Sequence, residues 1–314
     1  MRCVVASLVF FIASAAACEP YHLIAGRVPL DWQGPDGNTV ILDGKRSLIV
    51  VDTGRSPAHA QAILDYAAQR HRPIAAIINT HWHLDHTTGN YDIRQVYPAA
   101  AVYASSAIEG ALVGFLNKRR SAEDKRLADP TASQGEKAQL LRGRHRVDHP
   151  DTLRPTLPVR RSAWVMIAGR RLEVRLAKFA ATEGDVWIYD PKTRTAIVGD
   201  LVVGLVPFMD TACPNGWSNA LKAIAAVPFA TLIPGHGEPM GRADFLVWRT
   251  AFDAFISCGL STEPKQTCIN GWERNAAKFI DGAHRTYVRS AAAYYIETRL
   301  RSSPEEQQRY CRPL

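Results

Sequence analysis

The chain has 314 residues, of which 46% are hydrophobic and 22% are charged. These proportions are those of an ordinary globular protein, and they exclude a disordered, collagen-like or coiled-coil chain. The formal net charge of +8 makes the chain mildly attractive to anions but does not by itself indicate nucleic-acid binding.

The first residues have the pattern of a secretory signal peptide. Met1-Arg2 gives a positive start, an apolar segment follows, and small residues close it. The apolar segment is shorter than the roughly 20 residues of a membrane span, and an uncleaved anchor is the alternative. We expect residues 1–17 to be a cleaved signal and the mature protein to be periplasmic or secreted. Cys18 directly follows the small residues and resembles the cysteine of a bacterial lipoprotein signal, so a membrane-anchored lipoprotein is a second outcome.

Cysteine usage agrees weakly with an oxidising compartment. Two of the six cysteines, Cys3 and Cys18, belong to the signal region. The other four allow two disulfides in three connectivities. They are Cys213, Cys258, Cys268 and Cys311. Their closeness in sequence favours a bond between Cys258 and Cys268, and buried free thiols are the alternative.

The mature sequence predicts alternating strands and helices. Strands are expected at residues 22–30, 40–42, 47–51 and 74–78, and Ser56-Pro57 begins a helix at 56–70. Later elements are a helix at 107–115, hairpins at 164–176 and 186–198, a helix at 218–226, a strand at 231–233, and helices beyond Gly241, including 287–300. No internal sequence repeat is visible.

Four side chains that can bind metals follow the apolar strand at 74–78. They are His81, His83, Asp85 and His86. Two histidines at i and i+2 in an extended segment point the same way and can share one ion, and the next two side chains can serve a second ion. The segment therefore predicts a metal centre with one or two ions. Zinc (Zn²⁺) is the default for histidine and aspartate ligands, and iron or manganese fits them nearly as well.

The segment Thr80-His81-Trp82-His83-Leu84-Asp85-His86 resembles the T-H-x-H-x-D-H motif of the metallo-β-lactamase superfamily of binuclear metallohydrolases. Three further steps resemble the same family in the same order: Asp52-Thr53-Gly54, Gly199-Asp200 and Pro234-Gly235-His236-Gly237. The resemblance implies an α/β fold, an αβ/βα four-layer sandwich of two mixed β-sheets with outer helices. It also implies a metal-ligand set of His81, His83, Asp85, His86, Asp200 and His236, in which Asp200 bridges the two metals.

One position departs from the family pattern. Where the family has a third histidine for the first metal, in a stretch like H-T-x-G-D, this chain reads Ala181-Thr182-Glu183-Gly184-Asp185. Three outcomes stay open. Water fills the gap in a weakened first site, a residue from elsewhere such as His145 or His149 replaces the missing ligand, or only the second site holds an ion.

The resemblance implies a metal-dependent hydrolase. A metal-bound hydroxide would attack an ester, thioester, amide or similar bond of a small substrate, with Asp85 as the catalytic residue that orients the hydroxide. One alternative is a non-catalytic or single-metal degenerate member of the same fold, and another is a β-lactamase. Asp200 favours the hydroxyacylglutathione hydrolase branch, whereas export favours a β-lactamase. No Gly-x-Ser-x-Gly is present, which argues against a serine hydrolase of that type.

The expected organisation is a metallo-β-lactamase-like domain over residues 18–257 and a helical C-terminal extension over 258–314. A basic insertion lies at about residues 106–161, and its part 118–161 has 12 Lys and Arg against 6 Asp and Glu. Near the active site it would favour an anionic substrate, and a solvated insertion is the alternative. No aromatic residues interleave the charges, so we expect no nucleic-acid partner, and membrane contact only through the signal or a lipid on Cys18. The sequence leaves the oligomeric state open.

Overall fold

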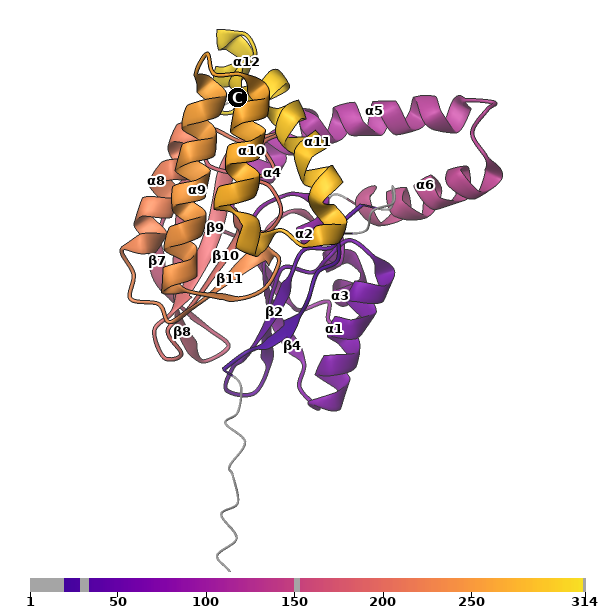
Figure 1. Ribbon diagram of the computed structural model, residues 1–314. Helices are drawn as coiled ribbons and strands as arrows, with labels where there is room; N and C mark the ends of the chain where they lie inside the picture. Colours follow the sequence, from indigo (N-terminus) through magenta and orange to yellow (C-terminus); the bar gives the residue numbers. More distant parts are fainter. Residues whose placement is uncertain (1–19, 29–33, 150–152, 313–314) are drawn as a thin grey trace, which may run out of the picture.

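The computed structural model describes residues 20–28, 34–149 and 153–312. The predicted signal peptide and Cys18 lie outside these residues, so both stay predictions. Two six-stranded sheets lie face to face, and helices cover the outer side of each (Figure 1). The predicted αβ/βα four-layer sandwich of two mixed sheets is confirmed. In the part of the chain that the structure describes, no helix combines the length and apolarity needed to cross a membrane.

The N-terminal half of the chain builds the first sheet, in the order β1-β2-β3-β4-β5-β6. Its strands are β1 (His22–Ile24), β2 (Thr39–Asp43), β3 (Leu48–Val51), β4 (Ile74–Ile78), β5 (Ala101–Ala104) and β6 (Leu157–Pro158). The first two strand pairs are antiparallel and the other three are parallel. Of the strand predicted at 22–30, residues 29 and 30 lie outside the described residues. The described part ends at residue 24, and the Asn38 side chain accepts the N–H of Gly26 at 2.8 Å.

The second sheet has the order β12-β11-β10-β9-β8-β7. Its strands are β7 (Ala163–Ile167), β8 (Arg170–Lys178), β9 (Gly184–Asp190), β10 (Thr195–Val203), β11 (Thr231–His236) and β12 (Met240–Gly241). The two predicted hairpins are confirmed as the antiparallel pairs β7–β8 and β9–β10. Strand β11 joins β10 in parallel, so the ends of both strands reach the same part of the molecule.

Helices follow the strands in both halves of the chain, and most of them cover the outer faces of the sandwich. In the first half they are α1 (Pro57–Gln69), α2 (Leu84–Thr87), α3 (Asn90–Val96), α4 (Ala107–Val113), α5 (Phe115–Ala128) and α6 (Gln134–Val147). In the second half they are α8 (Pro214–Ala225), α9 (Arg242–Leu260), α10 (Lys265–Asn275), η1 (Ala277–Phe279), η2 (Gly282–His284), α11 (Arg285–Tyr295), η3 (Ile296–Leu300) and α12 (Pro304–Gln308). Ser56 caps α1 as predicted, since its hydroxyl accepts the N–H of His59 at 3.2 Å.

The interior of the sandwich follows from the alternation of side chains along the strands. On β2, Val40 and Leu42 share a buried cluster with second-sheet side chains such as Ile188. Ile41, between them, packs on the other face with Ile63 of α1. Burying such a side chain stabilises the fold by about 1.5–3 kcal/mol. This packing holds the strand ends from which the predicted metal ligands extend.

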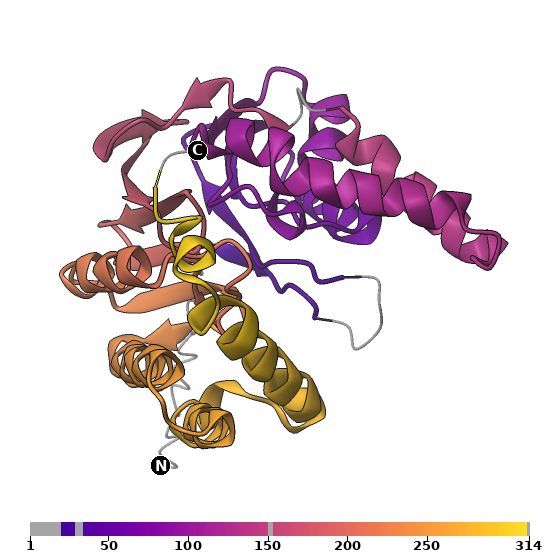
Figure 2. The ribbon, with the colours of Figure 1, turned by 90° about the horizontal axis from the view of Figure 1, so that it is seen from above.

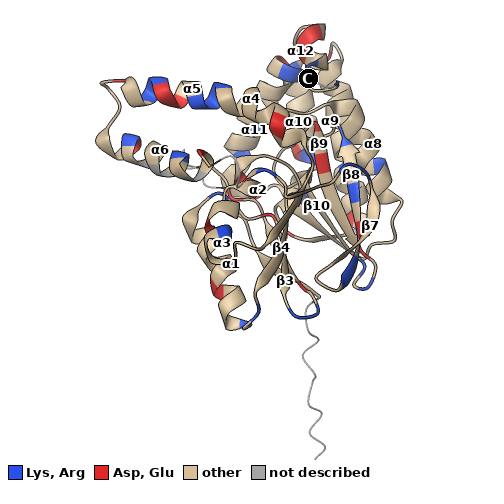
Figure 3. Cartoon of the chain, turned by 180° about the vertical axis from the view of Figure 1, so that it is seen from behind, with Lys and Arg blue, Asp and Glu red and all other residues tan. Residues whose placement is uncertain are grey.

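Helices α5 and α6 form a hairpin that extends away from the two sheets (Figure 1). Lysine and arginine residues lie along both helices (Figure 3). Some of these cations are paired within the hairpin, because Arg126 binds Asp129 and Glu136. Arg144 likewise binds Asp124. The basic insertion is therefore largely helical, and its attraction for anionic substrates stays a prediction.

The C-terminal helices pack on the second sheet, beside α8 and α9 (Figure 2). Trp272 of α10 and Ile296 of η3 belong to the same buried cluster as Val202 of β10. The expected boundary after residue 257 falls inside α9, which continues to Leu260. The division of the chain into a domain and an extension stays a prediction.

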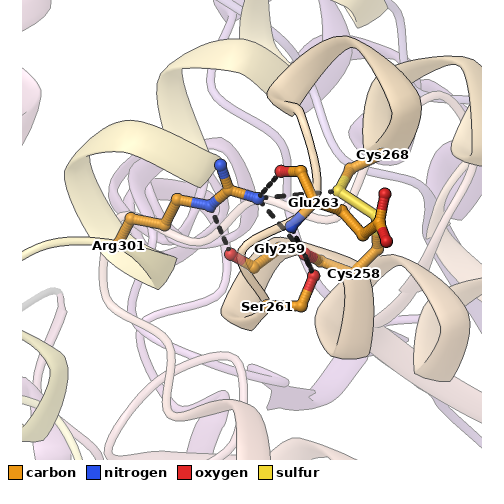
Figure 4. The surroundings of a disulfide bond; sticks show 6 residues. All are labelled: Cys258, Gly259, Ser261, Glu263, Cys268 and Arg301. Carbon is orange, nitrogen blue, oxygen red and sulfur yellow. Dashed lines mark hydrogen bonds between the residues drawn. A yellow bond between two sulfur atoms is a disulfide. The ribbon is translucent and has the colours of Figure 1, made fainter.

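Two disulfides hold the C-terminal helices. The predicted bond between Cys258 and Cys268 is confirmed and joins the end of α9 to α10. Arg301 lies beside it and donates to nearby backbone carbonyls, among them that of Gly259 at 2.8 Å (Figure 4). The second bond joins Cys213 to Cys311 across 98 residues and ties the C-terminal segment to the loop before α8.

Candidate metal centre

The six predicted ligands come together from three separate parts of the chain. They form two groups, in each of which the ligand atoms lie within 4.8 Å of one another: His81, His83 and Asp200, and Asp85, His86 and His236. The first four ligands in sequence lie between β4 and the end of α2, whereas Asp200 lies on β10 and His236 ends β11. Both sheets therefore contribute to each group.

The second group has the dimensions of a tetrahedral site. His86 Nε2 lies 3.3 Å from His236 Nε2 and 3.7 Å from Asp85 Oδ2. His236 Nε2 and Asp85 Oδ2 are 3.2 Å apart. Asp200 Oδ1 lies 3.2 Å from His86 Nε2 and 3.6 Å from His236 Nε2. Four donors bound at about 2.0–2.1 Å to a tetrahedral zinc ion would be about 3.3–3.4 Å apart, so these four atoms fit one divalent ion.

Asp200 faces both groups. Its Oδ1 belongs to the four-atom cage, and its Oδ2 lies 3.6 Å from His81 Nε2 in the other group. These three atoms are buried, and no described residue forms a hydrogen bond with any of them. A buried polar atom without a partner costs about 1–3 kcal/mol. A cation beside Asp200 Oδ2 and His81 Nε2 would compensate that cost in the first group, as one beside Oδ1 would in the cage.

The electrostatics of the two groups also favour cations. Burial lowers the pKa of His81 well below its ordinary value and lowers that of His83, so both imidazoles are neutral and offer a lone pair. Burial also opposes a charge on His86, but the surrounding carboxylates, first that of Asp200, hold the pKa of His86 well above its ordinary value. The negative field that favours a proton on His86 favours a metal ion at the same place.

Asp52 orients two of the predicted ligands. It follows β3 with a φ of 58°, a left-handed conformation that non-glycine residues rarely adopt. Its Oδ2 accepts the Nδ1–H of His86 at 2.8 Å and the hydroxyl proton of Thr80 at 2.7 Å. Because that hydroxyl has no second proton, Thr80 Oγ1 accepts the Nδ1–H of His81 at 3.0 Å. Both histidines thereby turn Nε2 toward the predicted ligand groups, where a metal ion would displace the proton that His86 Nε2 carries. The sequence marked Asp52 only by resemblance, without this role.

Replacing Asp52 by asparagine should weaken both groups at once. An amide has a single acceptor oxygen, so its NH₂ group must face either the Thr80 N–H, which Asp52 Oδ1 accepts at 2.7 Å, or the Thr80 hydroxyl and His86 Nδ1–H, which Oδ2 accepts. We expect 10–100-fold weaker zinc binding, the usual effect of losing a partner of a metal ligand. Competition with a chromophoric chelator measures this affinity. Asp43→Asn is the matched control, since Asp43 pairs with Arg72 near the surface. Wild-type affinity in Asp52→Asn would contradict the orienting role.

Two glycines allow the ligand strands to approach each other. A Cβ atom at Gly235 would lie 2.0 Å from Asp200 Oδ1. Gly199 has a φ of 53°, and a Cβ there would lie 2.4 Å from Thr80 Oγ1. The glycines of the G-D and P-G-H-G steps therefore leave room for the side chains that form and orient the centre.

Arg55 and Trp82 lie beside the predicted ligands. Arg55 Nη2 is 3.7 Å from Asp85 Oδ1, which places a permanent positive charge next to the cage. Trp82 donates its Nε1–H to Glu183 at 3.0 Å, and its ring centroid is 5.5 Å from that of Phe115. Since Phe115 begins α5, the base of the basic hairpin lies beside the metal centre.

A family model described as the metallo-beta-lactamase superfamily matches residues 32–236, more than half of the chain. The chain belongs to the metallo-beta-lactamase superfamily. All six predicted ligands lie within the matched residues. The superfamily resemblance drawn from the histidine motif is confirmed.

Named relatives in the superfamily are hydrolases. The chain is 24% identical over 222 residues to a linear primary-alkylsulfatase from a Pseudomonas species, and 38% identical over 72 residues to a hydroxyacylglutathione hydrolase from Gloeobacter violaceus. These alignments cover 64% and 23% of this chain. They cover 41% and 27% of the two relatives, so the chain spans less than half of the length of either.

Solved structures share the superfamily fold. A metallo-beta-lactamase family protein from Thermus thermophilus matches with a TM-score of 0.57 and 16% identity, over 90% of this chain and 95% of that protein. A sec-alkylsulfatase from a Pseudomonas species matches with a TM-score of 0.56 and 17% identity, over 88% of this chain and 49% of that enzyme. At these identities the two matches support the fold alone.

Position 181 departs from the superfamily pattern in the structure as well. Ala181 is buried, and its methyl group offers no ligand atom. His145 and His149 lie instead beside Tyr91, with ring centroids 5.6 Å and 5.2 Å from the Tyr91 ring. Neither belongs to the two ligand groups found among the described residues. The structure thus contradicts the outcome in which one of these histidines replaces the missing ligand. The weakened two-ion site and the single-ion site stay open.

Proposed function

We propose that this chain is an exported metal-dependent hydrolase that cleaves an ester, thioester or similar bond in a small anionic substrate. The observation that supports the proposal is the tetrahedral cage of Asp85, His86, Asp200 and His236, whose Asp200 also faces His81. One or two divalent ions held there, zinc or else iron or manganese, would polarise the scissile bond and lower the pKa of a water molecule.

The protein side chains would divide the remaining work. Burial opposes the charge on Asp85, but His86, His236 and Arg55 hold the pKa of Asp85 well below its ordinary value, so its carboxylate is ionised at neutral pH. Its Oδ2 belongs to the cage, and its Oδ1 faces the Arg55 guanidinium at 3.7 Å. Asp85 Oδ1 can therefore accept a hydrogen bond from the attacking water and orient it.

The charges beside the cage favour a negatively charged substrate. Arg55 is permanently cationic, and the adjacent hairpin carries much of the excess positive charge of the chain. An alkyl sulfate ester, the substrate class in the name of one relative, is an anion and is our second candidate besides a thioester. The signal-like N-terminal sequence and the two disulfides support export to an oxidising compartment.

The test uses the purified mature chain loaded with zinc, iron or manganese. It is assayed with a carboxylated thioester, a neutral ester, an alkyl sulfate and nitrocefin. We expect hydrolysis of an anionic ester or thioester that disappears in Asp85→Ala and persists in Asp65→Ala, a control on the exposed face of α1. Zinc binding without turnover of any substrate would favour a non-catalytic member of the fold. Turnover of nitrocefin in preference to the others would favour a β-lactamase.

A further inference from the structure

The loop before α8 places one buried hydroxyl against the ligand His83. Thr211 is fully buried, and its Oγ1 lies 2.9 Å from His83 Nε2. The same Oγ1 donates its proton to the carbonyl oxygen of Ala181 at 3.1 Å. A carbonyl can only accept, and a hydroxyl has one proton, so Thr211 must accept from His83. His83 Nε2 therefore carries the proton, and His83 Nδ1 carries the lone pair.

This arrangement parallels the one that orients His81. There, Thr80 donates to Asp52 and accepts from His81 Nδ1–H, which leaves Nε2 for the ion. At His83 the threonine binds the opposite ring nitrogen, so the ion would meet Nδ1. The acceptor that fixes the second threonine is the backbone of Ala181, the position where the family pattern has a ligand histidine. Position 181 thus still acts on the first site, through its carbonyl oxygen.

The C-terminal segment holds the loop that carries Thr211. Arg299 donates to the carbonyl of Met209 at 3.0 Å and to that of Ala212 at 3.3 Å. The Tyr295 hydroxyl donates to Asp210 at 2.9 Å. The disulfide from Cys213 to Cys311 holds the end of the same loop, directly before α8. The backbone on both sides of Thr211 is therefore held in place, and its side chain is held by the hydrogen bonds to His83 and to the Ala181 carbonyl.

We propose that Thr211 is a positioning residue of the first metal site: it fixes the Nδ1 lone pair of His83 toward the ion and so offsets part of the loss of the ligand at Ala181. This inference rests on the metal centre of the proposed function. It assigns to the C-terminal helices, which hold the loop, a structural part in metal binding.

The experiment is a zinc titration of the purified mature protein in competition with a chromophoric chelator. The wild type should bind two zinc ions, and the second site, with Asp85, His86 and His236, should bind zinc more tightly than the first, with His81, His83 and Asp200. Thr211→Val should weaken zinc binding at the first site by 10–100-fold and leave the affinity of the second site within about threefold of the wild-type value. Thr211→Ser, which keeps the hydroxyl, should restore the wild-type value. Thr250→Val, at an exposed threonine of α9, is the control for the substitution itself.

If Thr211→Val binds two zinc ions with the same two affinities as the wild type, the inference is overturned. A wild type that binds a single ion would overturn it as well. Absence of zinc binding in the wild type would instead overturn the proposed function together with it. Should Thr211→Val fail to fold, ¹⁵N–¹H NMR of the zinc-free wild type decides, with the His83 signals assigned by their loss in His83→Gln. A proton on Nε2 supports the inference, and a proton on Nδ1 contradicts it.

Discussion

Replacing Asp200 by asparagine is expected to lower zinc affinity at both sites by more than 100-fold and to abolish turnover. Losing a mere partner of a ligand costs 10–100-fold, and Asp200 is placed to bind two ions directly. The amide would keep one neutral oxygen and turn its NH₂ toward either His81 Nε2 or the cage, which lie on opposite sides of the carboxylate. Elemental analysis of zinc per chain after dialysis measures the loss.

Asp253→Asn is the control for this change. Asp253 lies on α9, where its carboxylate accepts a hydrogen bond from Ser218 at the surface at 3.2 Å. This variant should keep the zinc content and the turnover of the wild type. An Asp200→Asn protein that retains two zinc ions would show that the carboxylate does not bridge the sites. One retained ion would show that it serves a single site.

Removing the disulfide between Cys213 and Cys311 is expected to lower the free energy of unfolding more than removing the one between Cys258 and Cys268. The bond closes a loop of 98 residues, and the entropy of such a loop corresponds to about 4–5 kcal/mol of unfolding free energy. The bond between Cys258 and Cys268 spans 10 residues, for which the same relation gives about 2–3 kcal/mol. Urea unfolding of the two paired serine variants, Cys213→Ser with Cys311→Ser and Cys258→Ser with Cys268→Ser, measures both values.

Each pair serves as the control for the other, because both remove two sulfurs and one bond. Equal losses for the two pairs would mean that loop entropy does not set the contribution of these bonds. A larger loss for the 258–268 pair would mean that the contacts of Arg301 around that bond matter more than the length of the loop it closes (Figure 4).

The histidine motif could be predicted from sequence because its donors are close together in the chain. His81, His83, Asp85 and His86 lie within six residues, directly after an apolar strand. Asp200 and His236 needed the family resemblance, since only the pairing of β10 with β11 brings them to the same place. The strands themselves followed from apolar runs and turn residues, which are local signals.

Other parts of the centre carry no local signal. Thr211 lies 128 residues from His83, and no spacing rule connects a loop threonine to a distant imidazole. The bond from Cys213 to Cys311 was one of several pairings, because cysteine connectivity depends on the folded path. The first strand was predicted too long because the role of Asn38, a side chain that binds the backbone of Gly26, depends on the tertiary fold.

The origin of the ligands in both sheets couples metal binding to folding. One set follows β4 of the first sheet, and the other comes from β10 and β11 of the second. An ion bound by both sets would act as a reversible crosslink between the two halves of the sandwich, present only in the folded state. At a free ion concentration 100 times the dissociation constant, such a crosslink adds about 2.7 kcal/mol to the free energy of unfolding. The resistance of this protein to heat or denaturant would then rise and fall with the metal supply of its surroundings.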